Sequence, residues 1–373
     1  MAKKRVILMY ISEISGHHSA TLAIERALKF LNDEIKVINI NIFNYTNPIS
    51  ERVVNKLYMG AIKKFPWIWD YLYDNIKIKR IIDYLKIFVH RVNIPKLRDL
   101  FQQFKPEVVV CSQAYPCGMV ADYKKFYPSD IKLIAVLTDF IPHSYWIYDT
   151  VDYYIAPSPE VAQKLVHKGV SLEKIKILGI PVDICFTEAL SQQQIIRKLG
   201  LSDDLPKILI MGGGQGLGPI SSIVESLNEI DMELEIIVVT GINRKLYRIL
   251  EAKMNNFKHK LLLFGFVNNI AELMTISDII ITKPGGITTA EALCKNLPMV
   301  IVEPIPGQEM SNARYLISKG AAVLLEKPAQ TKDILKELLL NKEKLERMRK
   351  ASAEISKPTS SIDIAKLILA LIN

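Results

Sequence analysis

Two glycine-rich segments of the sequence have the composition of phosphate-binding turns. The first follows an apolar run and consists of Gly212, Gly213, Gly214, Gln215 and Gly216. Glycine lets the backbone turn sharply and approach a ligand, and a helix that starts there offers N–H groups to an anion. The spacing is not G-x-G-x-x-G, because Pro219 stands where the last glycine would be, and no Lys-Ser/Thr pair follows. The pattern favours neither a dinucleotide fold nor an NTPase, and a purely structural tight turn is the alternative.

The second segment begins at Lys283 and contains Gly285, Gly286, Thr288 and Thr289. Glu291 follows about one helical turn further on, where its carboxylate could accept two hydrogen bonds from a ribose diol. The alternative is an ordinary capped helix start with an acidic residue in its first turn. Two such turns in one half of the chain together predict a site for a nucleoside diphosphate.

A third loop, at 304–312, follows another apolar run and carries Gln308, Glu309 and Asn312. It is expected at the carboxyl end of a parallel strand, where open α/β sheets bind ligands. These side chains offer donors and acceptors that suit sugar hydroxyl groups. Polar capping of the next helix is the alternative interpretation.

Residues with acid–base potential lie in the first half of the chain. His17 and His18 follow Gly16 just after the first apolar run, and Asp139 follows the fourth run. A positioned base contributes roughly 100- to 10,000-fold to a rate. His17 is the predicted base, with Asp139 assisting or replacing it, and the sequence leaves His18 open as an alternative. No Asp-x-Asp pair is present, so we expect neither a catalytic metal ion nor a cofactor.

The elements that must position these residues are apolar runs of Val, Ile and Leu that alternate with amphipathic stretches. In the first half the runs lie at 5–10, 35–40, 107–111, 131–137, 152–155 and 175–178. In the second half they lie at 207–211, 235–240, 261–264, 278–282, 299–303 and 322–325. Such runs are typical of parallel strands buried on both faces. Two series predict an α/β protein with two doubly wound, Rossmann-like domains.

The domain boundary is expected just after Pro181. The predicted arrangement is an N-terminal domain at 1–181, a linker at 182–206, a C-terminal domain at 207–355, and a closing helix at 356–373 that packs back on the first domain. The 373 residues suit two domains of ordinary size. The four cysteines lack metal-ligand spacing, and we expect free thiols.

The net charge of +9 is concentrated in one segment, since residues 52–98 hold eleven basic and three acidic side chains. This segment also carries aromatic side chains and includes Lys63, Lys64, Trp67 and Trp69. Basic and aromatic residues of this kind favour the interface of an anionic membrane. A solvated helical insertion is the alternative, and no nucleic-acid-binding module is recognisable. Without an apolar stretch of about 20 residues or a signal-peptide cleavage site, we expect a cytoplasmic protein, peripheral on the inner face of the cell membrane.

The run KPGGITTAEAL, followed by the PGQE segment and Asn312, resembles the donor-site signature of the monogalactosyldiacylglycerol synthase and processive diacylglycerol glucosyltransferase family. This family is related to the N-acetylglucosaminyltransferase of peptidoglycan synthesis. The resemblance extends over both halves of the chain. It includes Gly16-His17, Thr138-Asp139-Phe140 with His143 and Trp146, the exit segment 179–182, the turn at 212–218 and Phe264-Gly265-Phe266.

The resemblance implies a GT-B fold of two domains that face a central cleft, the first for the acceptor and the second for the donor. It implies a UDP-glucose or UDP-galactose donor, a diacylglycerol acceptor and inversion to a β-glycoside. In the donor domain Glu291 would bind the ribose and Gly285 to Thr288 the phosphates. Uracil would be held by the backbone of Phe266 and Val267, and the hexose by Gln308 and Glu309. Gly16, His18 and His143 would lie on the acceptor side.

Two other functions remain open from the sequence. One is transfer from UDP-N-acetylglucosamine to another lipid acceptor, and the other is a nucleotide-sugar epimerase of the same fold. An epimerase would need no membrane segment and would act on the soluble UDP-sugar alone. Nothing in the sequence separates glucose from galactose, which differ in the orientation of one hydroxyl group.

Overall fold

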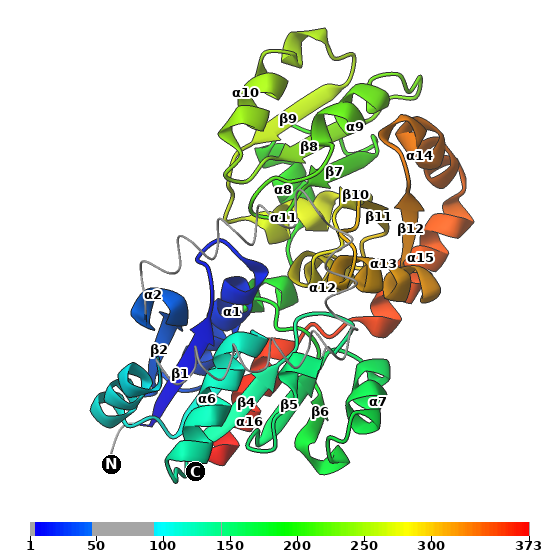
Figure 1. Cartoon of the computed structure of the whole chain (residues 1–373). Coiled ribbons are helices and arrows are strands. Elements are labelled where there is room, and N and C mark those ends of the chain that lie inside the picture. Colours follow the sequence, from blue (N-terminus) through cyan, green and yellow to red (C-terminus); the bar gives the residue numbers. More distant parts are fainter. Residues whose placement is uncertain (1–3, 47–92, 143, 373) are drawn as a thin grey trace. The chain divides into compact units, whose positions relative to one another are not determined.

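The computed structural model describes residues 4–46, 93–142 and 144–372, and the chain divides into two compact units. Unit 1 contains the residues up to 184 together with 305–308 and 359–373, and unit 2 contains 185–304 and 309–358. Each unit is built on a six-stranded sheet with helices on its faces (Figure 1).

The sheet of unit 1 is parallel and has the order β2-β1-β3-β4-β5-β6. Its strands are β1 (Arg5–Tyr10), β2 (Lys36–Asn41), β3 (Val108–Cys111), β4 (Lys132–Val136), β5 (Tyr153–Ala156) and β6 (Ile175–Ile177). Helices α1 (Gly16–Leu31), α2 (Ile42–Thr46), α6 (Ala114–Phe126), α7 (Pro159–His167) and α16 (Ser360–Leu371) belong to the same unit. All strands run in the same direction, but the order in which the chain adds them reverses between β1 and β3. The strand after β1 is β2, on one side, and the strand after β3 is β4, on the other.

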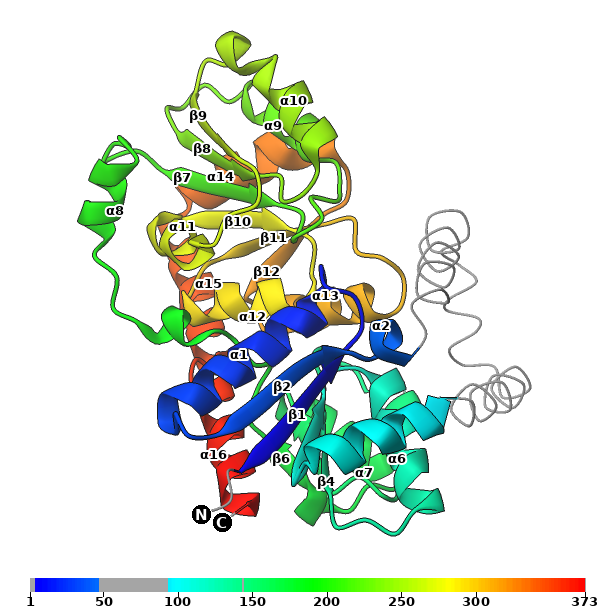
Figure 2. The ribbon, with the colours of Figure 1, turned by 90° about the vertical axis from the view of Figure 1, so that its left-hand side faces the viewer.

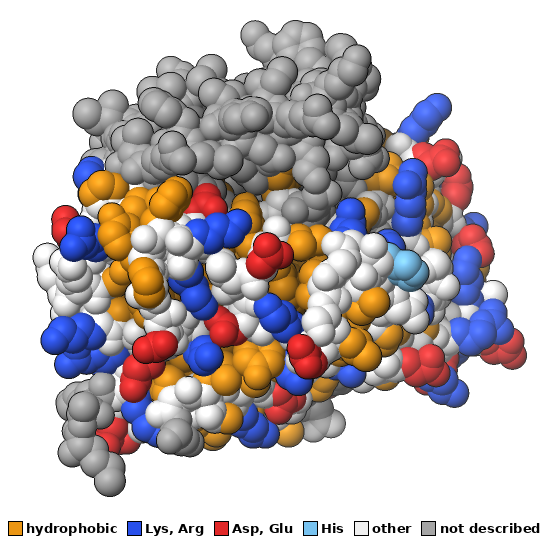
Figure 3. All heavy atoms as spheres, turned by 60° about the horizontal axis from the view of Figure 1, so that its bottom comes forward, with side chains coloured by type: hydrophobic (Ala, Val, Ile, Leu, Met, Phe, Trp, Pro, Cys, Tyr) orange, Lys and Arg blue, Asp and Glu red, His pale blue; other side chains and the backbone are white. Residues whose placement is uncertain are grey.

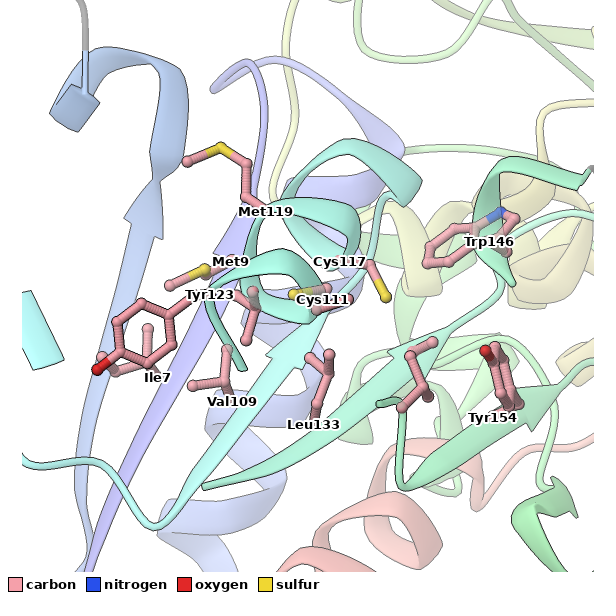
Figure 4. Close-up of a cluster of buried hydrophobic side chains, with 14 of the residues drawn as sticks. Ile7, Met9, Val109, Cys111, Cys117, Met119, Tyr123, Leu133, Trp146 and Tyr154 are labelled. Carbon is pink, nitrogen blue, oxygen red and sulfur yellow. The ribbon is translucent and has the colours of Figure 1, made fainter. Parts of the chain in front are cut away.

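Successive residues of the central strands enter two different cores, as the two-residue period of a strand requires. Ile7 and Met9 of β1 pack in one buried cluster, which Figure 4 shows with Val109, Cys111 and Leu133. Val6 and Leu8 of the same strand pack in the other cluster. Both faces of the sheet are therefore covered, which explains the continuous apolar runs in the sequence.

The second of these cores is closed by helices from opposite ends of the chain. Ile24 and Leu28 of α1 and Ile364 and Ile368 of α16 are fully buried in it, and Figure 2 shows both helices beside the sheet. Ser360, the first residue of α16, donates its hydroxyl to Ile180 O at 2.7 Å, and its Oγ accepts from Val182 N at 3.2 Å. The closing helix is thus an integral layer of unit 1.

The sheet of unit 2 is also parallel and has the order β12-β11-β10-β7-β8-β9. Its strands are β7 (Lys207–Met211), β8 (Glu235–Val239), β9 (Lys260–Phe264), β10 (Ile279–Thr282), β11 (Met299–Val302) and β12 (Ala322–Leu325). The helices are α8 (Gln192–Lys198), α9 (Ile220–Leu227), α10 (Arg244–Glu251), α11 (Ile270–Ile276), α12 (Gly286–Cys294), α13 (Gln308–Ser318), α14 (Thr331–Leu340) and α15 (Lys342–Ile355). In this sheet the order of strand addition reverses between β7 and β10.

All twelve predicted strands are present, each boundary within one residue of the predicted range, so the prediction of two Rossmann-like domains is confirmed. The segment 182–206, predicted as a linker, contains the helix α8. Ile195 and Ile196 of α8 are buried, and Gln192 Nε2 donates to Thr275 O of α11 at 3.0 Å. Much of this segment is therefore a packed part of unit 2.

Candidate functional site

In unit 1 the predicted acid–base residues lie together at the switch point, where the order of the strands reverses between β1 and β3. His17 lies in the first turn of α1, which follows β1, and the neighbouring strands β3 and β4 end at Cys111 and Val136. Ser15 caps α1, since its Oγ accepts from His18 N at 3.3 Å. The carboxyl ends of parallel strands at such a switch point are the usual place for a ligand in an open α/β sheet.

The ring of His17 is held by groups that follow two other strands. Its Nδ1 lies 2.8 Å from the carbonyl oxygen of Ser112 and 3.1 Å from Oγ1 of Thr138. A carbonyl oxygen can only accept, so Nδ1 carries the hydrogen and the neutral ring keeps its lone pair on Nε2. Burial lowers the pKa of His17 below its usual value of 6.5, although Asp139 and the Ser112 carbonyl act in the opposite direction. The ring is therefore a neutral base near pH 7.

His18 has a different environment. Its ring stacks on Tyr10, with the centroids 4.1 Å apart, and its Nδ1 lies 2.8 Å from Glu13 O. Tyr10 also donates its hydroxyl to the Glu13 carboxylate at 2.7 Å. These contacts fold the loop between β1 and α1 onto the strand end. The geometry favours His17 as the acid–base group and His18 as a residue that shapes the loop.

Asp139 lies half-buried next to Thr138, and its charge acts on His17. Gly16 is exposed at the start of α1. His143, like the predicted membrane residues Lys63, Lys64, Trp67 and Trp69, lies outside the described residues.

In unit 2 the first glycine turn leaves β7 at the corresponding switch point, and two of its glycines, Gly212 and Gly216, are required by the packing around them. A Cβ on Gly212 would lie 1.9 Å from Leu217 O, and one on Gly216 would lie 2.0 Å from Thr240 O. Gly216 and Gly213 also have φ values of +59° and +65°, which favour glycine. The turn is thus folded tightly against the loop after β8, and its geometry needs no ligand to explain these glycines.

The second glycine turn, after β10, is open. Gly285 is the N-cap of α12, and a Cβ built on it would meet no heavy atom within 4 Å. No side-chain hydrogen bond caps this helix at its N-cap position, so its first amides can bind an anion. Thr288 and Glu291 are half-buried on the same helix. Gly286 is buried, and the buried Thr289 donates its hydroxyl within the helix, to Gly285 O and Gly286 O.

Lys283 joins the second glycine turn to the predicted sugar-binding loop. Its Nζ lies 3.4 Å from the Glu309 carboxylate, and only 12% of its side chain is exposed. Asn312, fully buried, donates its Nδ2 to Pro284 O at 3.0 Å. Asn312 therefore positions the turn from inside. The sequence prediction passed over Lys283, although it is the first residue of the turn.

The remaining donor-side residues lie at other strand ends. Phe266, 62% exposed, and the half-buried Val267 follow β9, and Gln308 starts α13. A cavity of about 350 Å³ adjoins the end of β9 and is lined by Thr240, Gly241, Arg244, Tyr247, Arg248, Glu251 and Gly265. The sequence did not single out this cavity.

The described part of the chain contains no group of three or more His, Cys, Asp or Glu side chains that could hold a metal ion. None of its helices is long and apolar enough to cross a membrane. On the face drawn in Figure 3, basic and acidic side chains are mixed among separate hydrophobic patches.

The fold is that of the GT-B class. The structure is similar to Acinetobacter baumannii MurG, with a TM-score of 0.64 and 15% identity, covering 99% of this chain and 100% of that chain. It is also similar to Staphylococcus aureus MnaA in complex with UDP, with a TM-score of 0.66 and 16% identity, covering 99% and 97%. At these identities the likeness concerns the fold alone, and it does not separate transferases from epimerases.

The sequence comparisons define the family. Residues 17–182 match the monogalactosyldiacylglycerol (MGDG) synthase family, and residues 207–368 match the glycosyltransferase family 28 C-terminal domain. The chain is 30% identical to the processive diacylglycerol beta-glucosyltransferase of Bacillus subtilis, covering 98% of this chain and 95% of that protein. Its counterpart in Bacillus pumilus is also 30% identical, over 93% and 89%. The chain therefore belongs to the processive diacylglycerol beta-glucosyltransferase family, as the resemblance of its motifs predicted.

Proposed function

We propose that this chain is an inverting glycosyltransferase that moves glucose from UDP-glucose to the hydroxyl group of diacylglycerol at a membrane surface. The observation that carries the proposal is the 30% identity over 98% of the chain to a diacylglycerol beta-glucosyltransferase. The name of this relative favours glucose over galactose and a lipid acceptor over a soluble one. The two switch-point sites supply the chemistry that such a transfer needs.

Unit 2 binds the donor in this proposal. The open N-terminus of α12, with no Cβ at Gly285, takes the diphosphate, and Glu291 accepts hydrogen bonds from the ribose hydroxyls. The backbone of Phe266 and Val267 takes the uracil. Glu309, already held by Lys283, and Gln308 bind the hexose. The glycines at 212–216, in the first turn, have no side chains that would block the approach of the nucleotide.

Unit 1 supplies the base. Nε2 of His17 takes the proton from the acceptor hydroxyl while the acceptor oxygen forms its bond to the anomeric carbon from the side opposite UDP. The bond from that carbon to the UDP oxygen breaks, and the configuration inverts. Asp139 stabilises the imidazolium that forms. Amides of α12 and the Lys283 ammonium stabilise the charge on the departing UDP, because donors already in place need no reorganisation.

Membrane docking rests on the segment 52–98, with its eleven basic and three acidic side chains. Basic side chains near an anionic surface each contribute about 1 kcal/mol. A diacylglycerol acceptor stays in the bilayer, so the enzyme must work at that surface as a peripheral protein.

The test incubates the purified chain with UDP-glucose, UDP-galactose or UDP-N-acetylglucosamine and with anionic vesicles that contain diacylglycerol. Mass spectrometry of the lipids should find glucosyldiacylglycerol, formed with UDP-glucose and missing when diacylglycerol is left out. A lipid product only from UDP-N-acetylglucosamine would replace the donor. Epimerised UDP-sugar in lipid-free buffer, with no glycolipid from any donor, would refute the proposal in favour of an epimerase.

A further inference from the structure

We infer that Thr138 is a positioning residue: its hydroxyl oxygen and the Ser112 carbonyl form a two-acceptor cradle that fixes His17 as the Nδ1–H tautomer. The cradle keeps Nε2 as the only ring atom able to take a proton. Its importance for catalysis rests on the proposed function, whereas the tautomer itself is a property of the folded chain.

The distances define the direction of each hydrogen bond. Ser112 O lies 2.8 Å from Nδ1 and Thr138 Oγ1 lies 3.1 Å from the same atom. In the opposite tautomer Nδ1 would accept from Thr138, but its lone pair would then face the lone pairs of Ser112 O at 2.8 Å. A carbonyl oxygen cannot relieve that repulsion by donating. The Nδ1 hydrogen is therefore shared between the two oxygens, as in other three-centre bonds.

Both oxygens belong to buried residues of unit 1. Ser112 directly follows β3, is fully buried and is tied to β1 through Ser112 N, which donates to Met9 O at 3.2 Å. Thr138 lies two residues beyond β4 and is 5% exposed. In the described part of the chain its hydroxyl has no partner other than His17. A buried hydroxyl with this one contact is placed to serve the ring.

The cradle matters most when His17 becomes charged. Protonation of Nε2 makes Nδ1–H a stronger donor, and hydrogen bonds to charged groups stabilise more than neutral ones. The cradle therefore stabilises the imidazolium that forms as the acceptor hydroxyl loses its proton. Thr138→Val replaces one acceptor with a methyl group and favours the neutral ring, so the base becomes weaker and the pKa of His17 falls further.

The first test needs no activity. Nitrogen NMR of the chain labelled with ¹⁵N-histidine, with the His17 signals assigned by their loss in His17→Gln, reports the tautomer directly. We expect protonated Nδ1 and unprotonated Nε2 above the pKa. A hydrogen on Nε2 instead would overturn the inference whatever the enzyme makes. Conversely, the expected tautomer in a protein that makes no glycolipid would leave the inference intact and refute the proposed function.

The second test compares kinetic profiles. Thr138→Val should lower kcat about tenfold, as expected for one hydrogen bond to a charged group, with KM for the UDP-sugar unchanged. The acid limb of the pH profile of kcat/KM should move to lower pH, and Thr138→Ser should restore both values. Thr150→Val is the matched control, because it removes another threonine hydroxyl of unit 1, which donates to Ala121 O at 3.1 Å. An unchanged kcat and acid limb in Thr138→Val, or equal losses in Thr138→Ser, would overturn the inference.

Discussion

In both units the predicted functional residues lie where the order of the parallel strands reverses, but the two predicted sites use different parts of the chain. At β1 and β3 the site of unit 1 is made of side chains, chiefly His17, Thr138 and Asp139. At β7 and β10 the site of unit 2 is made largely of backbone, with glycine at the positions where the chain must turn or stay open. Under the proposed function, the same architecture thus serves two kinds of chemistry.

The difference follows from what each task requires. Proton transfer needs one group with a suitable pKa, and that group must be partly buried and held by neighbours. Phosphate binding needs several N–H donors and close approach, which short glycine segments provide locally. A side-chain site therefore depends on residues that are distant in sequence, whereas a backbone site is largely specified within a few consecutive residues.

The largest expected effect is a loss of transfer activity without a loss of UDP binding. His17→Ala should lower kcat by roughly 100- to 10,000-fold, because it removes the proposed base, and should leave UDP binding unchanged. Transfer assays and calorimetric titration with UDP measure the two quantities. His18→Ala is the control and should retain most of the activity, since the His18 ring stacks on Tyr10. Equal losses in the two variants would contradict the assignment of the base.

The reverse effect is expected from unit 2. Glu291→Ala should weaken UDP binding by roughly 10- to 100-fold, because two hydrogen bonds from the ribose to a carboxylate would be lost. The UDP affinity of Glu291→Gln should lie between those of Glu291→Ala and the wild type. The NMR signals of His17 should not change in either variant. UDP affinity equal to that of the wild type would remove Glu291 from the donor site.

Within unit 2, the two glycine turns should respond in opposite ways to the same change. Gly212→Ala should lower the free energy of unfolding by about 1–3 kcal/mol, because its Cβ would lie 1.9 Å from a backbone oxygen. Gly285→Ala should leave the free energy of unfolding within about 0.5 kcal/mol of the wild-type value, because its Cβ would enter open space. It should nevertheless weaken UDP binding about tenfold, because the proposed diphosphate would occupy that space. Denaturant unfolding and UDP titration of both variants check this contrast. A large loss of stability in Gly285→Ala would show that the second turn is also packed.

The smallest effect concerns pH. Burial lowers the pKa of His17 below 6.5, so the neutral base persists below that value, and the acid limb of kcat/KM should lie below pH 6.5. The unfolded chain binds this proton more readily, so the stability contributed by neutral His17 should decline as pH falls below 6.5. His17→Gln should remove this part of the pH dependence of unfolding. An acid limb above pH 6.5 would mean that the charge of Asp139 raises the pKa of His17 more than burial lowers it.

Much of the fold could be predicted from the sequence, because buried parallel strands form continuous apolar runs whose ends are marked by glycine, proline and polar residues. The segment 182–206 shows where this fails. Its polar composition predicts a linker, yet Ile195 and Ile196 are buried against the rest of unit 2. Two apolar residues in a short helix give too weak a periodic signal to reveal such packing.

The glycine turns show the same limit at the level of the site. The sequence identified both, but it did not separate Gly212, which meets its own turn, from Gly285, which faces open space. The separation depends on how the first turn is folded, since Leu217 O lies 1.9 Å from a Cβ built on Gly212 and Thr240 O of the loop after β8 lies 2.0 Å from one built on Gly216. Thr289 and Asn312 likewise have suitable polar groups, and only their buried hydrogen bonds show that they position the turn.

The sequence by itself determined the two strand series, the two glycine turns, the family and the presence of histidines after the first strand. Only the tertiary structure distinguished His17 from His18, because consecutive residues of one helix have the same local sequence environment. The partners that separate them, Ser112 and Thr138, lie 95 and 121 residues away from His17. The parallel sheet brings these strand ends together, and the carbonyl of Ser112 then determines which ring nitrogen carries the proton.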